Sequence, residues 1–304
     1  MIATILNAAL YTAGWLICVI SGARGDVWLP TLFTIISVFG QLAYWHRTDL
    51  NKYWRDLFLL VYATTIGLIM EMVFIGGGIL HYATKSSLFY LFPPSWLLWL
   101  YPLFSLTLNH SLSWIGRSYV IAAVFGGVGG ALSYLSGHYL GAVNFGDPLF
   151  FSLCVVALFW AIFMCVIVYL NRSLGTVVDL AVDNMRMAKQ VCLLYDGDCP
   201  LCSREVAMLK ERNRLGSVNF LDIANESYKM RDDVPVKYAE AMKEIHTVGS
   251  EGELLKGTDA FFEIYSRTGL TWLAIMLKAP LFSPLFKLGY KIFAKNRLRL
   301  TGRS

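Results

Sequence analysis

Apolar stretches about as long as a lipid bilayer is thick recur through the first half of the chain. A membrane-spanning helix needs ~20 consecutive, mostly apolar residues. Six stretches meet or approach that length: residues 2–20, 28–44, 57–80, 88–108, 115–135 and 149–170. The fourth contains Pro93 and Pro94, and proline cannot donate a backbone hydrogen bond, so a helix there should begin only after Pro94. The sequence therefore predicts a polytopic α-helical bundle of about six spans, or five spans and a re-entrant segment.

Charge divides the chain near residues 171–189. Residues 1–185 carry 7 Lys/Arg and 7 Asp/Glu, whereas residues 186–304 carry 19 and 14. We therefore expect a multi-span membrane domain over residues 1–172, a connector over 173–189 and a separate domain over 190–304. The N-terminus has neither the basic segment nor the cleavage site of a signal peptide, so the first apolar stretch is expected to remain as a span.

Basic residues in the predicted loops indicate how the bundle is oriented. With six spans, one side of the membrane receives Arg47, Lys52, Arg55, Arg117 and Arg172. The other side receives only Arg24 and Lys85. Cytoplasmic loops are enriched in Lys and Arg, so both termini are expected to face the cytoplasm. Five spans would place the C-terminal domain on the opposite side.

The C-terminal part alternates short β-rich runs with helical patterns. The runs "VCLLY", "VNFLDI", "EIHTV" and "ELLKG" predict strands at 191–195, 218–223, 244–248 and 253–257. Apolar spacing and capping residues predict helices at 200–216, with Gly216 as its C-cap, near 236–243, and at 258–269, with Thr258 as its N-cap. The order β-α-β-α-β-β-α is that of the thioredoxin fold, so we expect an α/β thioredoxin-like domain.

The run "YDGDCPLC" places Cys199 and Cys202 at the predicted junction of a strand and a helix. The thiolate is the reactive form of cysteine, and the partial positive charge of a helix N-terminus favours it. Spacing of i, i+3 puts both sulfurs on one face, so a disulfide can close between them. The expected roles are attack by Cys199 and resolution of the mixed disulfide by Cys202, with no metal or organic cofactor.

Other interpretations of these residues remain open. Structural zinc needs four ligands, and beyond the pair the C-terminal part offers only Cys192 and His246. The two cysteines could also be a vestigial or purely packed pair without a chemical role. Asp196 either relays protons or fixes the turn beneath the sulfurs, since Asp-Gly is a strong turn former. Cys192, inside a predicted strand, is expected to be an inert packed thiol.

The segment "YDGDCPLCSREVAMLKERN" resembles the signature of the DCC family of thiol-disulfide oxidoreductases, which is named after an Asp-Cys-Cys pattern. Here the pattern falls on Asp196, Cys199 and Cys202. "IHTVGSEGELLKGTDAF" and "FAKNRLRL" resemble later parts of that family, so the similarity spans about residues 190–300. The resemblance implies a thioredoxin-like fold, disulfide exchange and client proteins that carry a thiol or a disulfide.

The membrane half resembles a bacterial integral-membrane family of unknown function over about residues 1–172, through "PPSWLLWL" and "LTLNHSLSWIGRSYVIAAVFGGVGGALSYLSGHYLGAV". This implies the bacterial inner (cytoplasmic) membrane and lipid partners. Glu71, Asn109 and His110 lie at or near membrane depth, where polar groups are either functional or hold helices together. Four glycines are expected to mark close helix packing: Gly126, Gly127, Gly129 and Gly130.

A basic, aromatic tail follows Glu263, after which no acidic residue occurs. Its aromatic residues, Tyr290 and Phe293 among them, are expected to pack on the preceding domain, and a helix lying on anionic lipid is the alternative. No nucleic-acid-binding motif accompanies the charge, so nucleic acid is not expected as a partner. The sequence thus predicts a membrane-anchored, cytoplasm-facing thiol-disulfide oxidoreductase. The alternative is a non-enzymatic membrane transporter or scaffold protein whose C-terminal domain senses redox state or binds a partner.

Overall fold

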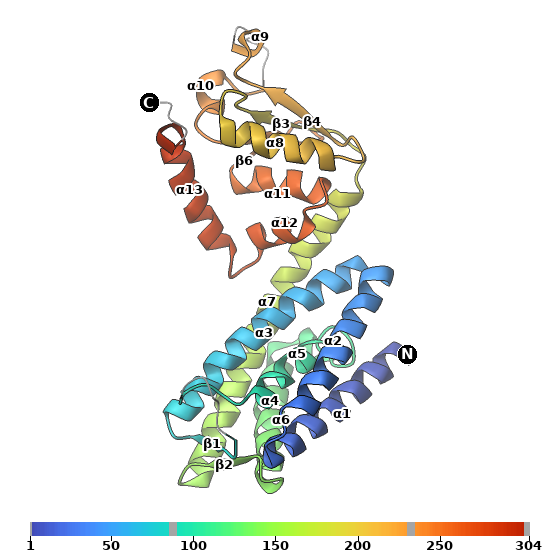
Figure 1. Cartoon of the computed structure of the whole chain (residues 1–304), viewed down its shortest axis with the longest axis vertical. Helices are drawn as coiled ribbons and strands as arrows, with labels where there is room; N and C mark the ends of the chain where they lie inside the picture. The colour runs from blue at the N-terminus through green and yellow to red at the C-terminus, as the bar shows by residue number, and fades with distance from the viewer. Residues whose placement is uncertain (1, 85–89, 230–234, 301–304) are drawn as a thin grey trace. The chain divides into compact units, whose positions relative to one another are not determined.

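Figure 1 shows the computed structural model of the chain, which describes residues 2–84, 90–229 and 235–300. The chain divides into two compact units, Met1–Arg172 and Ser173–Ser304, called here the membrane unit and the C-terminal unit. Helix α7 (Leu149–Arg186) belongs to both units, so residues 173–186, predicted as a connector, are helical.

Long helices form most of the membrane unit: α1 (Ile2–Arg24), α2 (Trp28–Thr48), α3 (Leu50–Gly76), α6 (Tyr119–Tyr139) and α7. Among the described residues, four helices are long and apolar enough to cross a membrane, namely α1, α3, α6 and α7. The predicted count of about six spans is therefore not confirmed. Helix α3 starts at an N-cap, Asp49, whose side chain accepts the N–H of Lys52 at 3.1 Å.

The predicted span over residues 88–108 is not a single helix. Residues 88 and 89 lie outside the described part of the chain. The rest contains two short helices, α4 (Ser95–Leu98) and α5 (Leu100–Ser105). A 3-10 helix, η1 (Ser113–Arg117), follows after the predicted span has ended. Helix α4 begins after Pro94, as expected. A further proline, Pro102, has no N–H to offer the carbonyl four residues earlier, which accounts for the break between α4 and α5.

The glycines of α6 contact α7, as predicted, at three of four positions. A Cβ added at Gly126 would lie 2.6 Å from the carbonyl oxygen of Trp160, and one at Gly130 would lie 2.4 Å from the indole of the same residue. At Gly127 the nearest atom is the carbonyl oxygen of Ala157, at 3.2 Å. Only small residues let two helix backbones approach this closely. The prediction is wrong for Gly129, whose added Cβ would meet only a side chain of its own helix at 3.9 Å.

Hydrogen bonds close the membrane unit at both ends. At one end β1 (Leu80–Tyr82) pairs antiparallel with β2 (Val143–Phe145). At the other end the hydroxyl of Ser111 donates to Asn7 in α1 at 2.6 Å, and Arg172 in α7 donates to the carbonyl of Gly116 at 2.6 Å. The start of α1 and residue 172 therefore lie at the same end of the unit.

The C-terminal unit is built on a four-stranded mixed sheet with the strand order β4-β3-β5-β6. Its strands are β3 (Val191–Tyr195), β4 (Val218–Asp222), β5 (His246–Val248) and β6 (Leu254–Lys256). Strands β3 and β4 are parallel, whereas β5 is antiparallel to both β3 and β6. Its own helices are α8 (Pro200–Arg212), α9 (Glu226–Lys229), α10 (Tyr238–Ala241), α11 (Thr258–Arg267), α12 (Thr271–Lys278) and α13 (Ser283–Leu300). All four predicted strands and all three predicted helices are present in the predicted order.

Several boundaries differ from the predicted ones. Helix α8 ends at Arg212 and not at Gly216. The reason is that the side-chain amide of Asn213 donates to the carbonyl of Val218 at 2.7 Å and accepts the N–H of Val218 at 3.3 Å. The helix predicted near 236–243 is a single turn, α10. Thr258 is the first residue of α11, and the N-cap is Gly257, whose φ of +57° is favoured by glycine.

The tail packs on the C-terminal unit along one side of α13. Tyr290 lies edge-on against Phe261 of α11, with ring centroids 5.7 Å apart, so the predicted packing is confirmed there. Leu285, Leu288 and Ile292 are exposed on the same helix, so the packing does not extend around it.

Candidate active site

A turn of four residues joins β3 to α8 and carries the first cysteine. The backbone N–H of Cys199 donates to the carbonyl of Asp196 at 3.2 Å, and the side chain of Asp196 accepts the N–H of Asp198 at 3.2 Å. This second bond is the local bond by which Asp residues stabilise turns. The geometry therefore supports the turn-forming interpretation of Asp196, which is buried.

A second carboxylate, that of Asp222, holds the turn from the neighbouring strand. Asp222 ends β4 beside Tyr195, and its Oδ1 accepts the N–H groups of both Gly197 and Ala224 at 2.9 Å. A Cβ at position 197 would lie 2.0 Å from the other carboxylate oxygen, so glycine is needed for this approach. The hydroxyl of Ser203 donates to the carbonyl of Gly197 at 2.7 Å and links the turn to α8.

The two cysteines stand at the first turn of α8, as predicted. Cys199 is the N-cap and Pro200 occupies the first helical position, where its missing N–H costs nothing. The side chain of Cys199 makes no capping hydrogen bond, although an N-cap side chain is placed to accept N–H groups of the first turn. A sulfur anion at Cys199 would lie at the positive end of a 13-residue helix.

The thiols differ in exposure. Cys199 is only 1% exposed, whereas Cys202 is half-buried and lines a cavity of about 480 Å³. Leu201, between them, is 49% exposed. Asp196 lines the same cavity as Cys202, whereas Cys199 is buried.

The cavity has apolar walls and a few charged groups at its edge. Aromatic residues of α11 and α13 line it, together with Arg204, Glu205, Lys243 and Glu244. Tyr265 donates to Glu205 at 2.8 Å, and burial, with a contribution from the Glu205 charge, raises the pKa of that phenol. Tyr290 of α13 accepts the N–H of Ile245 at 2.8 Å. A volume of this order suits a small molecule or a few side chains of a peptide.

The remaining ligand candidates of the C-terminal unit lie in the sheet. Cys192 is half-buried in β3, and burial raises the pKa of its thiol, as expected for a packed cysteine. His246 is buried in β5 with Nδ1 2.8 Å from the carbonyl oxygen of Glu244. Within the described parts of the chain, no three His, Cys, Asp or Glu side chains form a cluster that could hold a metal ion.

The polar residues predicted at membrane depth form two separate hydrogen-bonded groups. At one end Asp56 accepts from Asn109 at 2.9 Å and lies 2.6 Å from His110. Asn171 of α7 donates to Asn109 at 2.9 Å, so this group links three segments of the bundle. Glu71 belongs to a different group, built from tyrosines.

Sequence reasoning missed Asp222 and Ser203, and it identified Tyr290 only as a packing residue, not as part of this site. Asp222 ends the strand that runs parallel to β3, and the ends of adjacent parallel strands meet at one edge of a sheet, so its position was a usable signal. Ser203 lies in the first turn of a helix beside a cysteine pair, but a serine there carries no distinctive pattern. The hydrogen bond of Tyr290 to Ile245 could not be predicted, because the two residues are 45 positions apart.

Two thiols one turn apart at the start of a helix, directly after a buried strand, define a C-x-x-C dithiol site. Residues 193–303 match the family model described as a DCC1-like thiol-disulfide oxidoreductase. Residues 4–166 match a second family model, described as a protein of unknown function, DUF2878. The chain belongs to the DUF2878 family. The predicted fusion of a DCC-type domain to a membrane domain of unknown function is thereby confirmed.

One curated relative comes from Arabidopsis thaliana, where it is described as an uncharacterized chloroplastic protein. It is 42% identical over 118 residues, which are 38% of the present chain and 54% of that protein. The match thus spans about half the length of the relative. No solved structure matches the chain.

Proposed function

We propose that the C-terminal unit is a thiol-disulfide oxidoreductase that works through Cys199 and Cys202, and that the membrane unit anchors it. The observation that carries the proposal is the position of Cys199 as the N-cap of α8, with Cys202 one turn further along. Two findings support it: the match to the DCC1-like family, and a mixed sheet whose element order is the one expected of a thioredoxin-like domain.

The proposed reaction is a pair of thiol-disulfide exchanges. The thiolate of Cys199 attacks a client disulfide, forms a mixed disulfide and releases one client thiolate, which takes up a proton. The thiolate of Cys202 then attacks the sulfur of Cys199, closes the intramolecular disulfide and releases the second client thiolate. Two electrons pass to the client, and a separate dithiol donor must restore the pair. No metal or organic cofactor enters these steps.

The burial of Cys199 adds a requirement to this reaction. At 1% exposure its sulfur is closed to a client protein, so the turn at residues 196–199 must open before the first attack. The cavity beside Cys202, with the exposed Leu201 at its edge, offers an apolar surface for a client segment. We assign Asp196 to holding this turn.

A trapping experiment on the full chain tests the proposal. A Cys202→Ser variant lacks the resolving thiol and should accumulate mixed disulfides with client proteins through Cys199. Cys199→Ser should accumulate none. Cys192→Ser, which removes a half-buried thiol of β3 and leaves the pair intact, is the matched control and should behave like the wild-type chain. Trapping by Cys199→Ser alone would reverse the two roles, and trapping by neither variant would contradict the proposal.

For the location we propose the bacterial inner membrane, with the C-terminal unit facing the cytoplasm. The start of α1 and residue 172 lie at one end of the membrane unit, which supports placing both on the same side of the bilayer. Most of the basic loop residues lie on that side, including Arg117 and Arg172, as the positive-inside rule requires. A reporter fused after Ser304 that is active only outside the cytoplasm should stay silent; activity would reverse the orientation.

The burial of Cys199 favours a second candidate function, a non-enzymatic redox sensor or partner-binding module on a membrane scaffold or transporter. A buried thiol reacts slowly and suits a switch that changes state once, whereas a catalyst must cycle. Multiple turnovers of a small disulfide per protein, with a dithiol donor present, would favour the oxidoreductase. A single stoichiometric reaction would favour the sensor.

A further inference from the structure

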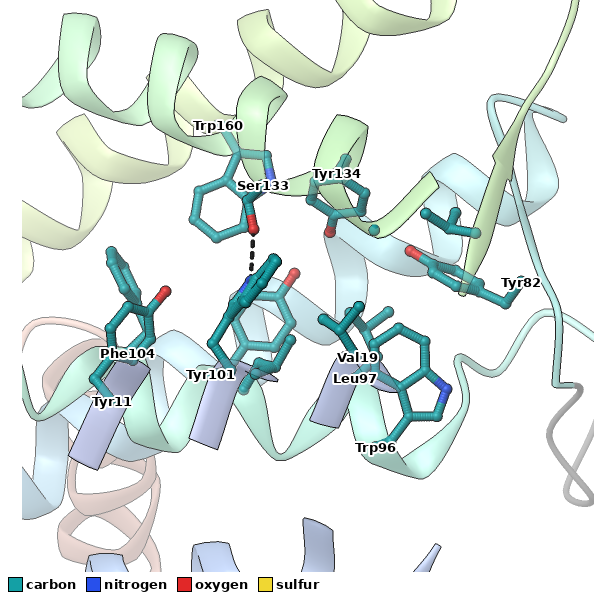
Figure 2. A pocket seen from close by; sticks show the side chains of 14 residues that line it. Tyr11, Val19, Tyr82, Trp96, Leu97, Tyr101, Phe104, Ser133, Tyr134 and Trp160 are labelled. Atoms are coloured by element: carbon teal, nitrogen blue, oxygen red, sulfur yellow. Dashed lines mark hydrogen bonds between the residues drawn. The ribbon is translucent and has the colours of Figure 1, made fainter. Parts of the chain in front are cut away.

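The membrane unit contains a cavity with largely aromatic walls. It lies among residues of α1, α4, α5, α6 and α7, and Figure 2 shows Tyr134 and Trp160 on one side of the space and Tyr101 and Phe104 on the other. Eight of the fourteen lining residues are tryptophan, tyrosine or phenylalanine. The hydrogen bond from the indole of Trp15 to Ser133, 2.8 Å long, joins α1 to α6 beside it.

A fully buried carboxylate, Glu71 of α3, lies behind three of these tyrosines. Tyr82 donates to its Oε2 at 2.5 Å, Tyr101 donates to its Oε1 at 2.6 Å, and Tyr134 donates to the same Oε1. An ionised carboxylate is an acceptor only, while a protonated one must also donate. Three phenol groups can satisfy the acceptors of the ionised form, which complete burial otherwise disfavours, so a bound cation would stabilise it.

The negative charge of Glu71 lacks a matching cation among the described residues. None of the ion pairs there involves Glu71, and no lysine or arginine is found among the residues that line the cavity. A buried charge is costly unless it is paired, and polar groups at membrane depth mark functional sites by default. The site thus has hydrogen-bond donors for the carboxylate but no positive charge.

The cavity supplies what a small cation needs. Aromatic faces attract ammonium groups through their electron-rich rings, and a phenol that donates its proton toward a carboxylate has a still more electron-rich ring. The phenol oxygens of Tyr82, Tyr101 and Tyr134 also keep lone pairs that can accept from an ammonium N–H. The cavity volume is about 50 Å³, several times the ~10–15 Å³ that one water requires, and suits one ammonium head group.

We propose that this cavity of the membrane unit is a binding site for a small organic ammonium ion, held by the aromatic walls and neutralised by Glu71. The proposal is independent of the thiol chemistry of the C-terminal unit. An anion would be repelled by Glu71, and a ring-bearing ligand such as a quinone is too large for the volume. An organic ammonium ion is preferred over an inorganic cation, because aromatic faces replace the hydration shell of an inorganic cation poorly.

The test uses the full chain in detergent and the tryptophan fluorescence of the cavity. Methylammonium is titrated at constant ionic strength against sodium and potassium, and against methanol as a neutral molecule of similar size. We expect a saturable change with methylammonium alone. Glu71→Gln, which keeps the shape and removes the charge, should weaken this binding at least tenfold. Tyr82→Phe, which keeps the ring and removes one donor, should weaken methylammonium binding severalfold. This variant replaces Glu71→Gln as the test if Glu71→Gln does not fold.

The matched control is Asp56→Asn, the same type of change at a buried carboxylate of the same helix. Asp56 lies 15 residues from Glu71, about 22 Å along α3 at ~1.5 Å per residue. This variant should bind methylammonium as the wild type does. No saturable response, an equal response to sodium or methanol, or unchanged binding by both Glu71→Gln and Tyr82→Phe would overturn the proposal.

Discussion

Two carboxylates, Asp222 in the C-terminal unit and Glu71 in the membrane unit, obtain their hydrogen bonds in different ways. The partners of Asp222 are backbone N–H groups of Gly197 and Ala224. The partners of Glu71 are three phenol hydroxyls. The cause is the surrounding secondary structure. Turns at the end of a sheet leave backbone N–H groups unpaired, whereas helices of a membrane bundle use theirs internally and leave only side chains as donors.

The largest loss in the free energy of unfolding is expected from Glu71→Leu. The change leaves three buried phenol hydroxyls without their acceptor, and each unsatisfied buried group costs about 1–3 kcal/mol, so we expect a loss of about 3 kcal/mol or more. Denaturant unfolding of the full chain in detergent measures it. Glu71→Gln retains one acceptor oxygen and should lose less. An unchanged unfolding midpoint for Glu71→Leu would show that the tyrosines find other partners.

Asp222→Ala removes the corresponding acceptor in the C-terminal unit. Two backbone N–H groups lose their partner there, but they lie nearer to water, so we expect a smaller loss, on the order of 2 kcal/mol. Both groups bond the same carboxylate oxygen, and Asn can supply an amide oxygen in its place. Asp222→Asn should therefore be close to wild type in thermal unfolding. Equal losses for the two variants would mean that the charge, not the acceptor, holds the turn.

Gly197→Ala tests the close approach of the turn to Asp222. The added methyl group would collide with a carboxylate oxygen, and we expect a loss of about 1–2 kcal/mol together with displacement of the turn. The effect should shrink in the Asp222→Ala background, because the collision partner is then absent. Gly289→Ala, at a helical position with open space around it, is the control and should be neutral or slightly stabilising. Additive losses in the double variant would contradict this account.

The smallest change in stability is expected from breaking an exposed ion pair, that of Glu240 with Lys256 at 2.7 Å. The hydrogen bond and charge of Lys256 lower the pKa of Glu240. A lowered folded-state pKa stabilises the fold above the ordinary Glu value of about 4.3, and the contribution disappears as pH falls below it. Lys256→Met should thus lower the melting temperature slightly at neutral pH, and the difference should vanish in acid. A difference independent of pH would show that packing, not charge, is lost.

The sequence predicted the parts of the molecule that depend on neighbouring residues. The Asp-Gly turn and the cysteine spacing could be interpreted because strand, turn and helix start lie within a dozen residues. The break in the predicted span over 88–108 was only half foreseen, since Pro94 was noted as a helix start but Pro102 was not recognised as a second interruption.

What the sequence could not predict depends on distant partners. The tyrosines around Glu71 are 11, 30 and 63 residues away from it, on three different elements. Only packing of the bundle brings them together, so a glutamate in an apolar stretch could be identified as noteworthy but not matched to its donors. The burial of Cys199 is likewise a product of the fold, since no local pattern shows which cysteine of the pair is covered.

The central claim is that Cys199 and Cys202 form one reversible dithiol, and a redox titration of the full chain measures this most directly. Protein is equilibrated across a series of thiol-disulfide buffers, quenched in acid, alkylated and digested. The masses of its cysteine-containing peptides are then measured by mass spectrometry. The account predicts a single two-electron transition in which one peptide carrying both cysteines loses two hydrogen atoms, with Cys192 alkylated throughout. Independent oxidation of the two sulfurs, or a bridge from either one to Cys192, would contradict it.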